Sequence, residues 1–344
     1  MDIGIIGATG YGGVELFRLL YNHPEVKTIN LYSSSQSGES IQEIYSHLNN
    51  EEYVLKDLDT EVMKQQLDVI FLATPAGVSS ELTPQLAGGK GVVIDLSGDL
   101  RLNSPEEYAA WYKKSPASEE VLKQSVYGLA EWNKEAIQSA KIVANPGCYP
   151  TAALIGLGPI VHERLADPSR IIIDAKSGVS GAGKNSNHVT HFANTQENFR
   201  IYKVNQHQHI PEIEQQLGNW NEETEPITFS THLVPMTRGI MATMYVELNN
   251  VLSLEELVGL YQTAYKDHPF VRVRRAGDFP CTRDVYASNY CDIGLALDER
   301  TGRLTIVAVI DNLMKGAASQ AVQNMNLTQG IDETTGLMQV PVYP

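Results

Sequence analysis

The chain has 344 residues, 42% of them hydrophobic and 19% charged, which is typical of a globular protein long enough for two domains. Its 26 Lys and Arg against 41 Asp and Glu give a net charge of −15, which argues against general binding to nucleic acid or to an anionic membrane. We expect no signal peptide and no membrane span, because no window approaches about 18 apolar residues. Three cysteines without a CxxC pair indicate a reduced, cytoplasmic protein with neither a disulfide framework nor structural zinc.

The first part of the chain alternates short apolar runs with amphipathic stretches. Buried strands that alternate with helices are typical of a doubly wound, parallel α/β sheet of the Rossmann type. We therefore expect residues 1–147 to form a dinucleotide-binding domain. Its predicted strands are 2–6, 28–32, 68–73, 91–96 and 141–144, and its predicted helices are 13–21 and 77–86.

A glycine-rich loop with the sequence GATGYGG follows the first strand and opens the first helix. Glycines at this place permit a tight turn and a close approach to a pyrophosphate, which the unpaired N–H groups of the helix start can bind. The alternative is a turn that serves only strand–helix packing. The residues we expect to contact a dinucleotide are Gly7, Thr9, Gly10, Tyr11, Gly12 and Gly13.

The second strand ends in a run of hydroxyl side chains, Ser33 and Ser34 among them. NAD enzymes usually carry an acidic residue there for the ribose 2′-hydroxyl. Its absence, with hydroxyls that can surround a 2′-phosphate, favours NADP, although no Arg stands in residues 33–37 to pair with that phosphate. A plain polar loop is the alternative.

The fourth and fifth strands lead into two further candidates. Ser97 and Arg101 follow the fourth strand, where ligands of parallel sheets bind, and Arg101 can hold an anion with both guanidinium nitrogens. Cys148 follows an Asn145-Pro146-Gly147 turn where the next helix begins. A helix N-terminus favours the thiolate, the form that attacks an acyl carbon. The alternative for Cys148 is a small buried side chain, which we also expect for Cys281 and Cys291.

The pattern changes after residue 150. Longer alternating strands at 170–175, 227–235, 240–248 and 304–310, with helices at 151–157, 210–217 and 254–265, predict an α+β domain with a mostly antiparallel or mixed sheet. A last, Ala-rich helix near 314–325 has few charges and should be buried.

A cysteine nucleophile needs a proton-transfer partner. His207 and His209 stand just before a predicted helix, and Glu212 lies within range to orient His209, which we favour over His207 as the acid–base residue. Surface or helix-capping histidines are the alternative. An H-x-H pair lacks a third ligand at a convincing spacing, so we expect no metal site.

Basic residues near small loops are candidates for anion binding. Lys176 and Lys184 flank a glycine-rich loop, and Arg238 lies in the segment PMTRG. Each of them could instead form a surface ion pair. Together with Arg101 they fit a doubly anionic substrate.

Taken together, the motifs resemble those of the N-acetyl-γ-glutamyl-phosphate reductase family, which is related in fold to aspartate-semialdehyde and glyceraldehyde-3-phosphate dehydrogenases. The resemblance covers nearly the whole chain and rests on seven segments. They are GATGYGG (7–13), SGDLRL (97–102), NPGCYPT (145–151), KSGVSGAGK (176–184), HQHIPEI (207–213), HLVPMTRG (232–239) and DNLMKGAASQAVQN (311–324).

The resemblance implies an NADP(H)-dependent reduction of N-acetylglutamyl 5-phosphate to the 5-semialdehyde and phosphate through a thioester, a step of arginine biosynthesis. It implies that Cys148 is the nucleophile, that the histidine segment supplies the acid–base residue, and that the enzyme is a homodimer or homotetramer. It also implies that residues 312–344 return to the dinucleotide domain, leaving 148–311 as a catalytic and oligomerisation domain. Residues expected at the cofactor are Ser180, Gly181, Asn312 and Lys315, and those at the substrate are Ser97, Arg101, Asn145, Lys176, Lys184 and Arg238.

Two departures from the family pattern are visible. Gln208 stands between the histidines where the family usually has Arg, and the loop after the second strand reads Ser-Ser-Gln where Arg is frequent. Two rival functions remain at this point. One is a related dehydrogenase acting on aspartyl or carrier-linked aminoadipyl phosphate, and the other is a non-catalytic NADP-binding sensor.

Overall fold

The computed structural model describes residues 1–48 and 53–343, which fall into two compact units. The first unit comprises residues 1–146 and 317–338. The second comprises residues 147–316 together with the last residues from 339. Among the described residues, no helix is both long enough and apolar enough to cross a membrane.

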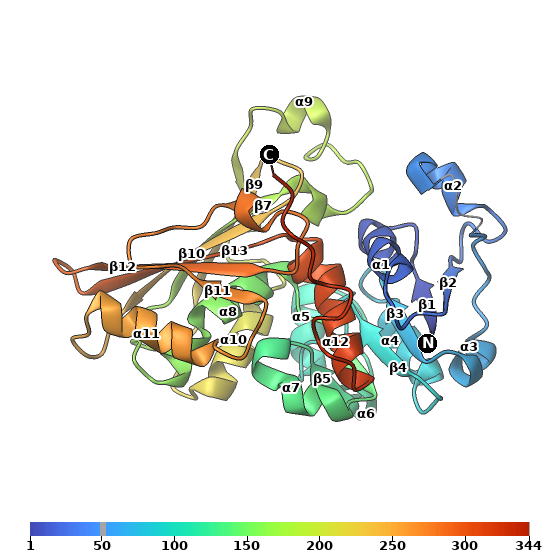
Figure 1. The fold of residues 1–344 in the computed structure, drawn as a ribbon, viewed down its shortest axis with the longest axis horizontal. Coiled ribbons are helices and arrows are strands. Elements are labelled where there is room, and N and C mark those ends of the chain that lie inside the picture. The colour runs from blue at the N-terminus through green and yellow to red at the C-terminus, as the bar shows by residue number, and fades with distance from the viewer. Residues whose placement is uncertain (49–52, 344) are drawn as a thin grey trace. The chain divides into compact units, whose positions relative to one another are not determined.

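The first unit is built on a six-stranded sheet in the order β2-β1-β3-β4-β6-β5, with every neighbouring pair parallel (Figure 1). All residues of β3 and β4 are buried, as expected of parallel strands covered on both faces. The strands are β1 (Asp2–Ile6), β2 (Thr28–Tyr32), β3 (Val69–Leu72), β4 (Val92–Asp95), β5 (Ser125–Tyr127) and β6 (Ile142–Ala144).

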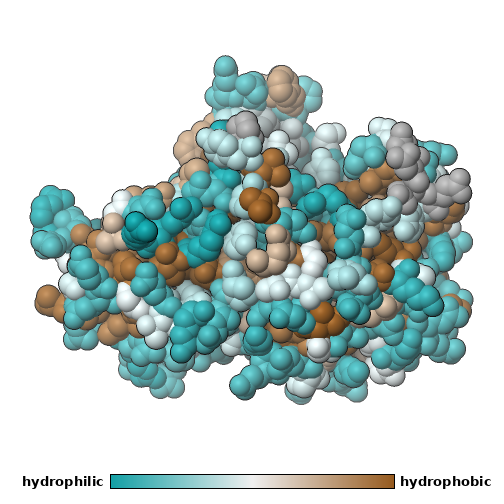
Figure 2. All heavy atoms as spheres, viewed as in Figure 1, coloured by the Kyte–Doolittle hydropathy of each residue, from teal (hydrophilic) through white to brown (hydrophobic). Residues whose placement is uncertain are grey.

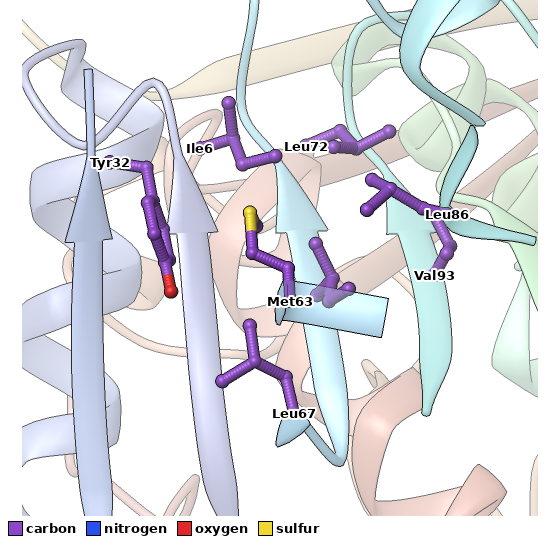
Figure 3. Close-up of a cluster of buried hydrophobic side chains, with 8 residues drawn as sticks. Ile6, Tyr32, Met63, Leu67, Leu72, Leu86 and Val93 are labelled. Carbon is purple, nitrogen blue, oxygen red and sulfur yellow. The ribbon is translucent and has the colours of Figure 1, made fainter. Parts of the chain in front are cut away.

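Eight α-helices belong to the part of this unit that the structure describes. Figure 3 shows how one face is filled: Ile6, Tyr32, Leu72 and Val93 project from four neighbouring strands toward side chains from the helices beside them. The helices are α1 (Tyr11–Tyr21), α2 (Ile41–Ile44), α3 (Thr60–Gln66), α4 (Ser79–Leu86), α5 (Pro105–Tyr112), α6 (Glu119–Gln124), α7 (Ala130–Ser139) and α12 (Ser319–Thr328).

The second unit carries a seven-stranded mixed sheet in the order β11-β12-β13-β10-β7-β9-β8. Its central pairs β12–β13, β13–β10 and β10–β7 are antiparallel, whereas β7–β9 and β11–β12 are parallel. The strands are β7 (Ile172–Gly178), β8 (Arg200–Tyr202), β9 (Thr228–Val234), β10 (Ile240–Glu247), β11 (Val271–Val273), β12 (Cys291–Asp298) and β13 (Arg303–Ile310).

The two faces of this sheet differ. Helices α8 (Cys148–His162), α10 (Ile210–Trp220) and α11 (Leu254–Ala264) lie on one side of it (Figure 1), while α9 (Phe192–Thr195) lies in the excursion before β8. Along β10, buried and half-buried residues alternate, so the face away from α8 keeps partial exposure. We call that face, which includes Lys176, Met241, Thr243 and Tyr245, the open face of the sheet.

The outer surface is mainly polar. Figure 2 shows hydrophilic side chains over most of the visible face, interrupted by smaller hydrophobic areas. This agrees with an acidic chain whose net charge is −15.

The expected fold class is confirmed: a parallel doubly wound sheet and a mixed sheet are both present. The expected last helix is buried as α12, preceded by a π-helical turn, Met314–Ala318. It groups with the first unit, whereas residues 312–316 and those from 339 group with the second. The sequence patterns missed helices α2, α3, α5, α6, α7 and α9, the short strands β5, β8 and β11, and the long strand β12.

Candidate active site

Cys148 is the first residue of α8, a 15-residue helix whose next 13 residues, Tyr149–Val161, are all buried. The first turn of this helix carries no acidic side chain, and Cys148 is partly exposed. A thiol at the positive end of a long helix is held in a setting that favours the thiolate. The expected helix start at the cysteine is therefore present.

A buried carboxylate fixes the turn before the cysteine. The backbone N–H of Gly147, the residue that caps α8, donates to Glu212 Oε1 at 2.8 Å, and Glu212 is fully buried in α10. The sequence suggested Glu212 as a partner for His209. The structure adds this contact to the main chain beside Cys148. It links α8 to α10 through residues 65 positions apart.

Both histidines pack against Tyr149, the residue that follows Cys148. The ring centroid of Tyr149 lies 5.4 Å from that of His207 and 6.0 Å from that of His209, and the two imidazoles are 4.6 Å apart. His209 caps α10, directly before Ile210 and Pro211. The residues singled out from two distant motifs thus meet around Tyr149.

Hydrogen bonds give His207 a defined tautomer. Its Nδ1 accepts the backbone N–H of His209 at 3.1 Å, which leaves the proton on Nε2. Nε2 lies 3.5 Å from Tyr202 Oη, which donates to Tyr149 Oη at 3.1 Å, and Tyr149 Oη donates to the His232 carbonyl at 3.2 Å. These donors and acceptors run in one direction, so the chain of hydrogen bonds is internally consistent.

Burial dominates the protonation equilibria of this chain of groups. It lowers the pKa of His207 to about 3, with a further contribution from the Lys203 ammonium. Burial also raises the pKa of Tyr202 to about 12 and raises the pKa of Tyr149. His207 is therefore neutral and the two phenols are protonated throughout the physiological range.

A glycine lies directly against Cys148. A Cβ atom on Gly316 would sit 2.8 Å from Cys148 Cβ and 3.2 Å from its Cα. The neighbouring loops are tied together by Asn312, whose Oδ1 accepts from Gly239 N–H at 2.8 Å and whose Nδ2 donates to Ser180 Oγ at 2.9 Å. Asn312 thus joins three expected segments of the second unit, and Gly316, four residues further on, packs against Cys148.

Arg238 is the expected substrate cation of this unit. Its guanidinium lies 3.6 Å from Asp311, which is fully buried and accepts the backbone N–H groups of Ala287 and Leu313. Asp311 therefore supports both Arg238 and the segment that leads to Gly316. The sequence motifs contained Asp311 but gave it no role.

Three expected basic residues lie elsewhere. Lys176 lies on the open face, because successive residues of a strand point to opposite faces and Ser177 points to the helix-covered side. Its ammonium pairs with the Asp174 carboxylate at 2.8 Å. Lys184 lies exposed in the excursion after β7, as does Gly181. Lys315 is fully buried, with its ammonium 5.8 Å from the Phe270 ring.

The glycine loop of the first unit has the form that a dinucleotide requires. Gly7 has φ +82°, and a Cβ on Gly13 would lie 2.3 Å from the Gly7 carbonyl oxygen, so these two glycines serve the turn and helix packing. A Cβ on Gly12 would meet nothing within 4 Å. The start of α1 carries no side-chain cap and no acidic residue, so its N–H groups suit a pyrophosphate.

The remaining expected residues of this unit occupy the ends of its strands. Ser33 is buried and Ser34 exposed after β2. Arg101 is buried and donates to the carbonyls of Asn145 at 2.8 Å and Leu96 at 3.0 Å. Ser97 contacts Ser79 through their hydroxyls.

Asn145 is fully buried at the start of the turn that leads to Cys148. Its Oδ1 accepts from Asn324 Nδ2 at 3.0 Å, and its Nδ2 donates to the Ala317 carbonyl at 3.2 Å. Both contacts are structural ones within the first unit. Within the described residues, no group of three or more His, Cys, Asp or Glu side chains is arranged to hold a metal ion.

Two family models match the chain. The model described as "Semialdehyde dehydrogenase, NAD binding domain" matches residues 2–140, and "Semialdehyde dehydrogenase, dimerisation domain" matches residues 148–312. Curated relatives match over their full length and over all of this chain. Those from Geobacillus sp. (strain WCH70), Geobacillus kaustophilus and Halalkalibacterium halodurans are 60%, 56% and 55% identical, and each is named N-acetyl-gamma-glutamyl-phosphate reductase.

Solved structures show the same fold at low identity. Aspartate semialdehyde dehydrogenase II from Vibrio cholerae superposes with a TM-score of 0.73 at 20% identity, covering 96% of this chain and 98% of that one. Aspartate semialdehyde dehydrogenase with NADP from Candida albicans superposes with a TM-score of 0.65 at 15% identity, covering 95% and 98%.

Proposed function

The chain belongs to the N-acetyl-γ-glutamyl-phosphate reductases of the semialdehyde dehydrogenase family, and we propose that it reduces its acyl phosphate through a thioester on Cys148. The family's reaction converts N-acetylglutamyl phosphate to the semialdehyde in arginine biosynthesis. The observation that carries the proposal is the position of Cys148 at the start of a long helix that has no side-chain cap. The two histidines pack against Tyr149, the next residue.

The first step is nucleophilic. The Cys148 thiolate adds to the γ-acyl carbon, and the carbon–oxygen bond to phosphate then breaks, so phosphate leaves with the bonding electron pair. Backbone N–H groups at the start of α8 stabilise the oxyanion of the tetrahedral intermediate. Arg238 and Arg101 are the proposed ligands of the substrate's anionic groups.

The second step needs a hydride and a proton. The nicotinamide cofactor, for which the loop from Gly7 to Gly13 is the proposed site, would supply the hydride when bound. The chain's own contribution is an acid–base group that donates a proton to the oxygen of the resulting thiohemiacetal. The same group takes that proton back when the carbon–sulfur bond breaks and the aldehyde is released. The thiolate is regenerated, so the cysteine is unchanged after each turnover.

We assign the proton transfer to His209. His207 Nδ1 is occupied by a main-chain N–H, and burial lowers its pKa to about 3, so it remains neutral and orients Tyr202. A His207→Gln variant should lower activity moderately without moving the pH profile. His209→Gln should lower kcat by about 100-fold or more, the usual contribution of a general acid–base group, and remove one limb of the profile. Equal pH profiles for both variants would contradict the assignment.

The test of the nucleophile uses Cys148→Ala, with Cys281→Ala as the matched control because Cys281 is exposed in the same unit. The phosphate-dependent reduction of nicotinamide cofactor by the semialdehyde should disappear in Cys148→Ala and persist in the control. Cofactor binding should persist in both. Retained turnover in Cys148→Ala, or an unreactive Cys148 in iodoacetamide labelling of the wild type, would overturn the proposal.

The cofactor preference, assembly and compartment are parts of the same proposal. NADP is supported by the hydroxyl side chains after β2 and by the NADP complex of the Candida albicans neighbour. A homodimer or homotetramer is supported by the "dimerisation domain" description of residues 148–312. We propose the open face of the sheet as its contact, because side chains along β10 stay partly exposed there. A cytoplasmic location is supported by three cysteines that form no disulfide, since Cys148 must stay reduced.

Assembly is tested at the centre of the open face. Thr243 lies there between Asp174 on β7 and Val307 on β13. Thr243→Arg should convert the oligomer to monomers in sedimentation experiments. Wild-type protein that sediments as a monomer at all concentrations would refute the oligomer.

A further inference from the structure

The chain folds back on itself after β2 and returns a lysine to the end of that strand. Lys56 N–H donates to the Leu31 carbonyl at 2.8 Å, and Ser33 N–H donates to the Lys56 carbonyl at 3.1 Å. Tyr32 and Lys56 form a parallel bridge. Lys56 therefore runs alongside the last residue of β2, although 24 positions separate it from Tyr32 in the sequence.

This returning segment also contacts the glycine loop. Tyr45, which follows α2 in the same excursion, donates its hydroxyl to the Thr9 carbonyl at 2.9 Å. The excursion is held to its own start by further main-chain bonds, such as Leu55 N–H to the Glu39 carbonyl at 2.9 Å. One segment thus reaches both the pyrophosphate loop and the end of β2.

Lys56 is available for a ligand. Its side chain is exposed, and its Nζ donates to the amide oxygen of Asn30 at 2.8 Å. Asn30 is neutral, so this contact orients the ammonium without neutralising it. A lysine ammonium on its flexible stem can move from such a partner to a nearby phosphate.

The end of the second strand is where dinucleotide folds distinguish the two cofactors, because the 2′ position of the adenosine ribose lies there. A 2′-phosphate needs a cation to bind. The need is greater here, because the chain has a net charge of −15 and Glu39 and Asp57 are acidic residues of the same segment. Residues 33–37 contain no Lys or Arg. The nearest cation that the fold returns to this strand end is Lys56, whose backbone pairs with Tyr32 and Ser33.

We propose that Lys56, together with the hydroxyls of Ser33 and Ser34, forms the site that binds the 2′-phosphate of NADP and sets its preference over NAD. This inference rests on the NADP part of the proposed function. It assigns the selectivity to a residue outside the loop after β2, where sequence motifs look for it.

The experiment measures cofactor binding without turnover, by quenching of protein fluorescence with NADPH and with NADH. Lys56→Gln should weaken NADPH binding about ten-fold, the loss expected for one charge-assisted phosphate contact, and leave NADH binding unchanged. Lys56→Arg should retain most of the preference. Lys27→Gln is the matched control, because Lys27 is an exposed lysine just before the opposite end of β2.

A second probe isolates the phosphate. Adenosine 2′,5′-bisphosphate should compete with NADPH on the wild type and lose about the same ten-fold on Lys56→Gln, while 5′-AMP should not distinguish the two proteins. If the wild type binds NADPH and NADH equally, the NADP part of the proposed function fails, and this inference with it. If the wild type prefers NADPH and Lys56→Gln keeps that preference, only the assignment to Lys56 is overturned.

Discussion

Gly316→Ala tests whether close packing sets the position of the nucleophile. The added Cβ would lie 2.8 Å from Cys148 Cβ, about 0.7 Å inside the roughly 3.5 Å at which carbon atoms pack without repulsion. Neither atom sits at the end of a flexible side chain, so the backbone must move. Overpacking of this kind costs about 1 to 3 kcal/mol, and a shift approaching 1 Å at a nucleophile costs up to about 100-fold in rate.

The assay pairs denaturant unfolding with kcat/KM and with the rate of iodoacetamide labelling at Cys148. The matched control is Gly259→Ala in the middle of α11, where the new Cβ meets nothing within 4 Å. That variant should gain about 0.5 to 1 kcal/mol from the better helix propensity of Ala and keep full activity. If Gly316→Ala matched this control in stability, labelling and kcat/KM, the packing argument would be refuted.

Further predictions follow from three buried polar side chains. Burial lowers the pKa of His23, so the unfolded state binds more protons and stability should fall as pH drops below about 6.5; His23→Gln should flatten that slope in unfolding titrations. Burial, reinforced by Asp99, raises the pKa of Asp95, so stability falls as pH rises above about 3.9; Asp95→Asn should be more stable than wild type at pH 7 and should lose that advantage near pH 4. Glu212→Ala should cost about 1 to 3 kcal/mol in unfolding experiments by leaving the Gly147 N–H buried without its acceptor, and Glu212→Gln should recover most of it through its amide oxygen.

Much of the fold follows from patterns in the sequence, and the exceptions have physical causes. Continuous apolar runs mark β1, β3 and β4, because these strands are covered on both faces. Strand β12 was missed because Gly294 interrupts it, and glycine normally weakens a strand. The structure gives the reason for that glycine: a Cβ there would lie 2.8 Å from Pro280 Cδ.

The short helices α5 and α6 of the first unit were not predicted from the sequence, for a different reason. Helix α6 is largely polar, α5 consists mostly of Ala and aromatic residues, and only Tyr108, Val121 and Leu122 in the two helices are buried. Such helices show little apolar periodicity, and their visible signals are caps: Ser104 and Ser118 accept main-chain N–H groups at their starts. Capping motifs with acidic first turns were the cue that would have found them.

For the candidate site, the sequence predicted the residue types and the helix starts. It did not predict the hydrogen-bond partners of the side chains. The motif around His207 and His209 is nearly symmetric in sequence, so it gave no reason to treat one imidazole as neutral. The asymmetry comes from the main chain, because the His209 N–H points at His207 Nδ1 and not the reverse. Tyr202, which carries no motif, extends this bond toward Tyr149.

This asymmetry has a kinetic consequence. A histidine whose pKa burial holds near 3 stays neutral from pH 5 to 9, so it contributes no ionisation to a pH–rate profile over that range. Any limb observed there in the wild type must come from another group, and we assign it to His209 or to the Cys148 thiol. Replacing Tyr202 by Phe removes the hydroxyl that links His207 to Tyr149, and should lower kcat while leaving both limbs in place. A limb that moved in Tyr202→Phe would instead tie the phenol chain to the ionisation itself.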